Sequence, residues 1–182
     1  MALAMLASRL PPDQPDLADK AAYLDSLVDR TIDAIHRITL DLRPSILDFG
    51  IVAALEWQVT EFEKQMGIRC SFACADKEIE LASDHAAALF RIFQEALTNI
   101  AKHARASTVA VTLQRRRNEV VLAIADNGVG IAPADRLKPQ SFGLRGMSER
   151  AMALGGTMAL SRARGGGTIV TIKTKERQRA SQ

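Results

Sequence analysis

Three short motifs bring together polar residues and glycines at spacings that could support chemistry. The first motif spans residues 94–103. Within it, Glu95, Asn99 and Lys102 stand at positions i, i+4 and i+7, and therefore share one face of a helix. A carboxylate, an amide oxygen and an ammonium on one face could hold Mg²⁺ and phosphate. The same pattern is also typical of an ordinary solvated helix face, so on its own it leaves both interpretations open.

The second motif, residues 126–130, reads Asp-Asn-Gly-Val-Gly and follows an apolar stretch that predicts a buried strand. The carboxylate of Asp126 at the end of such a strand is costly to bury unless it has a partner, and a purine amino group would be one. Two glycines spaced by one residue, Gly128 and Gly130, let the backbone approach a ligand closely. An ordinary Asp-Asn-Gly turn explains the same residues equally well.

The third motif, residues 142–147, opens a predicted helix with Phe-Gly-Leu-Arg-Gly-Met. The free backbone N–H groups and the positive end of the helix dipole make such a start a natural seat for phosphate. A lone Gly-x-x-Gly is weak support for this role. The sequence contains no Walker A loop and no dinucleotide-binding fingerprint after a strand.

The composition describes a folded chain without a strong electrostatic bias. Of 182 residues, 47% are hydrophobic and 25% are charged, which is enough for a core and excludes disorder. The formal net charge of +3 is weak for this length and gives no reason to expect nucleic acid or lipid as a partner. Aromatic residues make up only 4%, which further disfavours the base stacking used to bind single strands.

The two cysteines and the absence of long apolar runs predict a soluble, reduced, cytoplasmic protein. Cys70 and Cys74 are too few for a disulfide framework, and on a strand they would share a face and pack as small apolar residues. The first ten residues lack a basic leader and a long apolar segment, so they do not resemble a signal peptide. No apolar run approaches the roughly 20 residues that span a bilayer.

The N-terminal part is predicted to be helical. Three prolines interrupt residues 10–15, and apolar or small residues then recur at alternating steps of four and three from Leu17 to Leu42. Arg43-Pro44 ends this helix. A helical hairpin of this kind cannot bury its apolar stripe alone, so we expect a partner chain.

After Asp48 the pattern changes to mixed helices and strands, which favours an α+β fold, a two-layer sandwich in which helices cover a mixed sheet. Ser83 is expected to cap the second helix, and a basic turn at residues 115–118 to join two strands. The Gly/Pro-rich connection at residues 127–143 is long enough to suggest a function. The expected helices are 51–66, 83–100 and 144–154, and the expected strands are 68–74, 108–114, 120–125, 157–161 and 168–174.

In order and spacing, the combined motifs resemble the Bergerat ATP-binding fold of sensor histidine kinases, DNA gyrase, heat-shock chaperones and mismatch-repair ATPases. The sequence is most similar to the DesK/NarX-like class of sensor histidine kinases. The matching segments are 42–48 at the join between hairpin and ATP domain, 95–99 as the N box, 126–130 and 142–147 as the two glycine boxes, and 165–168 as the last Gly-Thr turn. The resemblance implies a partial dimerisation and phosphotransfer hairpin over residues 1–44, a catalytic ATP-binding domain over residues 45–176, and a disordered tail over residues 177–182.

The resemblance also implies roles for the residues of the N box. Asn99 would be a Mg²⁺ ligand, and Glu95 would act with it as a catalytic residue near the γ-phosphate. Lys102 and His103 would contact the phosphates of ATP.

The glycine boxes receive the remaining roles by the same resemblance. Asp126 would bind the adenine amino group, with Thr168 nearby. Gly128 and Gly130 would admit the nucleotide, and a lid over residues 131–142 would begin at Ile131. Gly143 and Gly146 would hinge this lid. The start of the following helix would hold phosphates, which adds Leu144 and Arg145 to the expected ATP-binding residues.

None of the three histidines fits the phosphoacceptor of this class, which is followed by an acidic residue. His36, His85 and His103 are followed by arginine or alanine. We therefore expect a kinase core that starts after its acceptor histidine, with any upstream sensor or membrane segment missing, and that binds nucleotide without phosphorylating itself.

The expected function is the ATP- and Mg²⁺-binding catalytic core of a two-component sensor histidine kinase, a homodimer through its hairpin that signals to a response regulator. Two alternatives remain. One is a non-catalytic dimerisation module that uses ATP as a conformational ligand. The other is a serine kinase of the anti-sigma type, against which the helical stripe from Leu17 to Leu42 argues.

Overall fold

The computed structural model describes residues 17, 20, 23, 24, 45–117, 119–131 and 142–175. The chain divides into two compact units, residues 1–43 and 44–182. The four described residues of the first unit are helical. The rest of the predicted hairpin, including His36, lies outside the described residues, as do lid residues 132–141 and the tail at 177–182. The assignment of the first unit as a dimerisation hairpin therefore stays a prediction.

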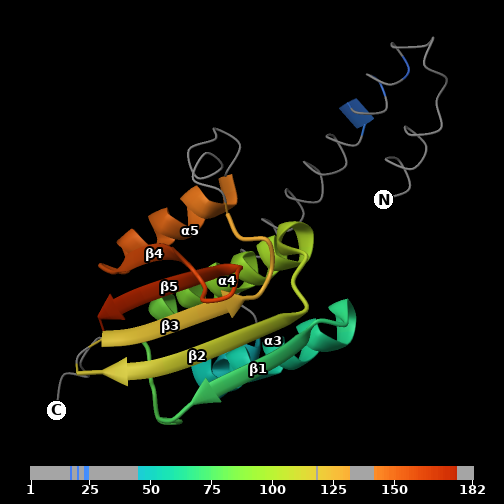
Figure 1. Cartoon of the computed structure of the whole chain (residues 1–182). Coiled ribbons are helices and arrows are strands. Elements are labelled where there is room, and N and C mark those ends of the chain that lie inside the picture. The colour runs from blue at the N-terminus through green and yellow to red at the C-terminus, as the bar shows by residue number, and fades with distance from the viewer. Residues whose placement is uncertain are drawn as a thin grey trace, which may run out of the picture. The chain divides into compact units, whose positions relative to one another are not determined.

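The second unit is built on a five-stranded mixed sheet, as expected (Figure 1). The strand order is β1-β2-β3-β5-β4, in which β1 pairs with β2 in parallel and the other neighbours are antiparallel. Along the chain, a helix and strand β4 separate β3 from β5, yet these two strands pair side by side in the sheet. The strands are β1 Arg69–Cys74, β2 Thr108–Arg116, β3 Glu119–Asp126, β4 Thr157–Arg162 and β5 Thr168–Lys175.

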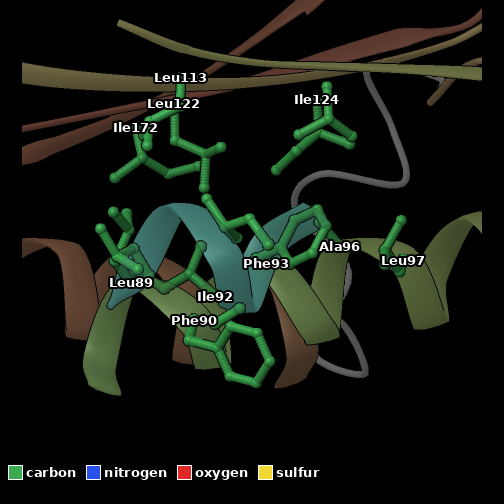
Figure 2. Packing of buried hydrophobic residues seen from close by; sticks show 14 of the residues in the cluster. Leu89, Phe90, Ile92, Phe93, Ala96, Leu97, Leu113, Leu122, Ile124 and Ile172 are labelled. Atoms are coloured by element: carbon green, nitrogen blue, oxygen red, sulfur yellow. The ribbon is translucent and has the colours of Figure 1, made fainter. Parts of the chain in front are cut away.

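Helices cover one face of this sheet, which confirms the predicted two-layer α+β sandwich (Figure 1). Alternate residues of β2 and β3 point into the core, so each strand has one buried face. Figure 2 shows side chains of α4, Ser83–Asn99, packed beneath Leu113, Leu122, Ile124 and Ile172 of the strands. The helical elements are the 3₁₀ turn η1 Ser45–Phe49, α3 Ile51–Met66, α4 Ser83–Asn99, the π turn η2 Ile100–Ala104 and α5 Phe142–Ala153.

The helix boundaries confirm one sequence prediction and correct another. α3 ends where expected, at Gly67, which adopts φ 67° and donates its N–H to the Glu63 carbonyl oxygen at 2.9 Å. Ser83, by contrast, is not the cap of α4. Ala82 occupies the cap position in an extended conformation and makes no side-chain hydrogen bond, so Ser83 is already the first helical residue.

The hairpin between β2 and β3 is tighter than predicted. Arg115 and Arg116 were expected in the turn, but they pair as strand residues with Val120 and Glu119. The reversal follows at Arg117, which has φ 56°. Polar residues on an exposed strand end carry no periodicity signal, so the sequence pattern does not reveal that the strand extends beyond its apolar part.

The cysteines behave as predicted. Cys70 and Cys74 are free, lie on the same face of β1 and pack half-buried against the core. Burial raises the pKa of the Cys70 thiol to about 11, which keeps it neutral and unreactive near pH 7. Within the described part of the chain, no helix has the length and apolar character needed to cross a membrane.

Candidate functional site

Asp126 ends β3 as a buried carboxylate that is 6% exposed. Its Oδ1 accepts the N–H of Gly128 at 2.8 Å, and its Oδ2 accepts the N–H of Thr168 at 3.2 Å. The partner that the sequence argument required is therefore supplied in part by the protein's own backbone. Each carboxylate oxygen accepts one hydrogen bond here and has a second lone pair, so the group can still accept a donor from a ligand.

The next residue, Asn127, has no expected role from the sequence. In the structure, both the oxygen and the nitrogen of its side-chain amide make hydrogen bonds. Its Oδ1 accepts the backbone N–H groups of Ser107 and Thr108, each at 2.9 Å, and its Nδ2 donates to the Ser107 hydroxyl at 2.9 Å. The available signal was the Asx residue itself, because such side chains often bond to nearby backbone. Its partners are distant in sequence, and only the β2–β3 pairing brings them close.

The glycines of this turn pack backbone against backbone. A Cβ on Gly128 would overlap the carbonyl oxygen of Ala104, and one on Gly167 would overlap the carbonyl oxygen of Asp126. Gly130, at φ 77°, would place its Cβ 3.2 Å from the Gly167 carbonyl oxygen. Side chains here would push apart the end of η2, the turn after β3 and the β4–β5 hairpin. The glycines thus permit close contact within the protein at the positions where close approach to a ligand was expected.

A second group of residues forms where α4 meets the start of α5. Glu95 and Asn99 are half-buried on α4. A Cβ on Gly143 would overlap Oε1 of Glu95 and would lie 3.5 Å from Nδ2 of Asn99. That Nδ2 atom is buried and has no hydrogen-bond partner among the described residues. The structure therefore brings the N box and the second glycine box into direct contact, with one polar atom left unsatisfied between them.

Lys102 and His103 lie on η2, where the helix is no longer α-helical, and both are exposed. A π turn closes i→i+5 hydrogen bonds and rotates each residue less than an α turn does. The i+7 spacing that aligned Lys102 with Glu95 and Asn99 assumed an uninterrupted α-helix, and the π turn changes that geometry between Asn99 and Lys102. The π turn has a different effect, because Ala104 at its end accepts the N–H of Val129 at 2.8 Å and so ties α4 to the turn after β3.

The residues at the start of α5 divide between core and surface. Leu144 packs against the core, whereas Arg145 is exposed and its Nε donates to Oε1 of Glu149 at 2.8 Å, which raises the pKa of Arg145. Neither Gly143 nor Gly146 has a positive φ, so neither position has a backbone conformation that favours glycine. A Cβ on Gly146 would meet only the flexible guanidinium of Arg150, at 3.1 Å.

Thr168 and Ile131 complete the expected site. Thr168 is 6% exposed and its backbone N–H donates to Asp126, while Ile131, the first residue of the predicted lid, is half-buried. An open depression of about 480 Å³ also borders Asp126. Residues of β1, β2 and the end of β3 line it, without Glu95 or Asn99, so it is separate from the contact between α4 and α5.

Comparison with known proteins identifies the relatives of this chain. The oxygen sensor histidine kinase NreB of Staphylococcus carnosus (strain TM300) is 33% identical over 162 residues, which cover 88% of this chain and 47% of NreB. The signal transduction histidine-protein kinase/phosphatase DegS of Brevibacillus brevis is 35% identical over 150 residues, 82% of this chain and 39% of DegS. The chain thus spans less than half the length of each of these relatives. Their identities to this chain confirm its resemblance to sensor histidine kinases.

Solved structures show the same fold. The histidine kinase domain of the blue-light activated histidine kinase from Erythrobacter litoralis EL346 matches with a TM-score of 0.63 at 18% identity, over 96% of this chain and 90% of that one. The ATP binding domain of PrrB from Mycobacterium tuberculosis matches with a TM-score of 0.59 at 22% identity, over 70% and 95% respectively.

A family model covers most of the ATP domain predicted from the motifs. The model described as histidine kinase-, DNA gyrase B-, and HSP90-like ATPase matches residues 84–178, slightly more than half of the chain. The matched segment contains all of α4 except its first residue, both glycine boxes and the last Gly-Thr turn. The chain therefore belongs to the histidine kinase-, DNA gyrase B- and HSP90-like ATPase family.

Proposed function

We propose that this chain is the ATP- and Mg²⁺-binding catalytic core of a two-component sensor histidine kinase. The observation that carries the proposal is that Gly143, at the start of α5, lies against the Glu95 carboxylate and beside the Asn99 amide, whose buried nitrogen has no hydrogen-bond partner among the described residues. The names of NreB and DegS support the choice of a histidine kinase within the family.

The base of ATP would bind at the end of β3. The Asp126 carboxylate would accept a hydrogen bond from the adenine amino group, since both of its oxygens already face fixed N–H groups and cannot turn away. Thr168 and the turn through Gly128 and Gly130 would border the base, followed by Ile131 at the lid. This arrangement needs no aromatic stacking, in agreement with the low aromatic content of the chain.

The phosphates would lie at the start of α5, against α4. Mg²⁺ prefers oxygen ligands and usually keeps waters while bridging one or two protein groups to phosphates. Asn99 and Glu95 fit this donor set, and an amide can turn its oxygen or its nitrogen toward a partner. Within the described ranges, no group of three acidic, histidine or cysteine side chains forms a protein-only metal cage.

A bound Mg²⁺ would neutralise phosphate charge, and the other contributions come from the chain. Backbone N–H groups of the first turn of α5, at Gly143 to Gly146, would hold phosphate oxygens with help from the helix dipole. Lys102 and His103 are exposed on η2, directly after α4, and would contact the same phosphates. The Arg145 side chain is engaged with Glu149, so its contribution would come from its backbone.

The reaction would join the γ-phosphorus of ATP to a ring nitrogen of an acceptor histidine, while the bond to the β–γ bridging oxygen breaks and ADP leaves. Positioning and charge neutralisation are most of what such a transfer needs from a protein. Glu95 would orient or polarise the groups near the γ-phosphate. The phosphate would then pass to an aspartate of a response regulator, in a cytoplasmic dimer held together by the 1–44 hairpin.

Single-turnover transfer from γ-labelled ATP to a peptide carrying an acceptor-histidine helix tests this proposal. We expect acid-labile label on the peptide, and none on the chain, because none of its three histidines precedes an acidic residue. ATP binding without transfer would instead support a non-catalytic module, and acid-stable label on a serine would support the anti-sigma type of kinase.

A further inference from the structure

The β2–β3 ladder ends at a side chain. The last residues paired by the two strands are Val109 and Asp126, after which the backbone of β3 turns away into the glycine turn. The Asn127 backbone N–H still donates to the Thr108 carbonyl oxygen at 3.4 Å. The N–H groups of Thr108 and of Ser107, the residue before β2, are bonded by a side chain instead, because the amide oxygen of Asn127 accepts both of them at 2.9 Å.

The same amide makes a third hydrogen bond. Its nitrogen donates to the Ser107 hydroxyl at 2.9 Å, so a single side chain makes three contacts with two consecutive residues. Three bonds with different directions fix the position and the rotation of the amide. The backbone of Asn127 is thereby held between Asp126 and Gly128, the two residues whose carboxylate–amide bond shapes the turn.

We infer that Asn127 is a positioning residue for base recognition, which holds the Asp126 carboxylate in the orientation that accepts the adenine amino group. The inference rests on the proposed nucleotide binding. Asn127 itself need not touch the nucleotide, because its amide is bonded to Ser107 and Thr108. Its effect should therefore appear in the discrimination between bases that carry and lack the amino group, since only that contact passes through Asp126.

The three hydrogen bonds of the Asn127 amide determine which variants test the inference. Asn127→Leu has a similar size but leaves the Ser107 and Thr108 N–H groups without their acceptor. Asn127→Asp keeps that acceptor, and the Ser107 hydroxyl can rotate to donate to the second oxygen. Ser107→Ala removes only the third bond and is the matched control.

Calorimetry of the full chain with ADP and with IDP, both in Mg²⁺, provides the test, because IDP has a keto oxygen in place of the amino group. We expect Asn127→Leu to lose about tenfold in affinity for ADP, the usual effect of losing a hydrogen bond to a charged group, and less than about twofold for IDP. Asn127→Asp and Ser107→Ala should stay within about threefold of the wild type for both nucleotides.

Equal losses for ADP and IDP, or no loss for either, would overturn the inference. A wild-type chain that binds no ADP would instead overturn the proposed function together with this inference. If Asn127→Leu does not fold, Asn127→Ser replaces it, because its shorter side chain cannot reach both N–H groups. The expected selective loss for ADP is the same.

Discussion

At the end of β3, the side chains of Asp126 and Asn127 make five hydrogen bonds, to Gly128, Thr168, Ser107 and Thr108. At the end of α4, by contrast, Asn99 buries an amide nitrogen that has no partner among the described residues. Both places lie next to glycines. Around Asp126 the glycines let backbone pack on backbone, while Gly143 makes room for the side chains of Glu95 and Asn99.

This difference suggests a division of labour between the two ends of the candidate site. Fixed hydrogen bonds orient the Asp126 carboxylate before any ligand arrives, as electrostatic preorganisation requires. The α4–α5 contact is incomplete by comparison, because an unsatisfied buried amide is unfavourable until a partner arrives. We therefore expect the base end to set specificity and the phosphate end to respond to Mg²⁺.

Asp126→Ala should have the largest effect. It removes the proposed base contact and leaves the N–H groups of Gly128 and Thr168 without their acceptor. We expect ADP binding to fall by at least about a hundredfold, the combined effect of a lost charged hydrogen bond and a loosened turn. Calorimetry measures this directly, and an unchanged affinity would remove Asp126 from the site.

Gly143→Ala and Gly146→Ala form a matched pair on α5. The first would drive a Cβ into Glu95 beside Asn99, whereas the second meets only a movable guanidinium. We expect Gly143→Ala to slow phosphoryl transfer by more than tenfold, since small misplacements are costly in such reactions. Gly146→Ala should keep transfer near wild type and stabilise α5 by up to about 1 kcal/mol, visible in thermal unfolding.

Equal losses in these two variants would mean that both glycines serve lid motion, as the sequence resemblance implied. Equal tolerance would mean that the contact between α5 and Glu95 has no role in transfer.

Asn99→Ala should have an effect that depends on the cation. Loss of the amide removes a proposed Mg²⁺ ligand, so ADP should bind about tenfold more weakly in Mg²⁺ and with little change in EDTA. Titrations of the wild type and the variant under both conditions separate these terms. A loss of the same size in EDTA would assign Asn99 to packing instead of to the cation.

Arg145→Ala should have the smallest effect. Its guanidinium is exposed and paired with Glu149 on the same helix, and such surface pairs contribute little. Nucleotide affinity should change by less than about twofold. A tenfold loss would show that Arg145 leaves Glu149 to contact phosphate.

Much of the fold could be predicted from the sequence, because burial imposes periodicity. The alternation in β2 and β3 and the stripe on α4 identified their buried residues, and Gly67 marked the end of α3. The errors fall where burial does not decide. By residue type, serine is a good helix cap and alanine is a poor one. The backbone conformation at Ala82 nevertheless makes Ala82 the cap and Ser83 the first residue of α4.

The motifs of the candidate site could be found from spacing, but their contacts could not. The π turn at η2 leaves no mark in an apolar pattern, so the spacing of Lys102 was interpreted with α-helical geometry, which the structure does not have at that residue. The amide of Asn127 bonds to residues about twenty positions away, and the space around Gly143 is filled by Glu95 from another helix. Each of these contacts depends on tertiary pairing that a local motif does not contain.

The most direct test of the two-part site is calorimetry of the wild-type chain with adenosine and with ADP, each in Mg²⁺ and in EDTA. Adenosine reports on the base end alone, and ADP reports on both ends. We predict that adenosine binds equally well under both conditions, while ADP binds at least about tenfold more tightly in Mg²⁺. ADP binding that is indifferent to Mg²⁺, or adenosine binding that requires it, would contradict the account.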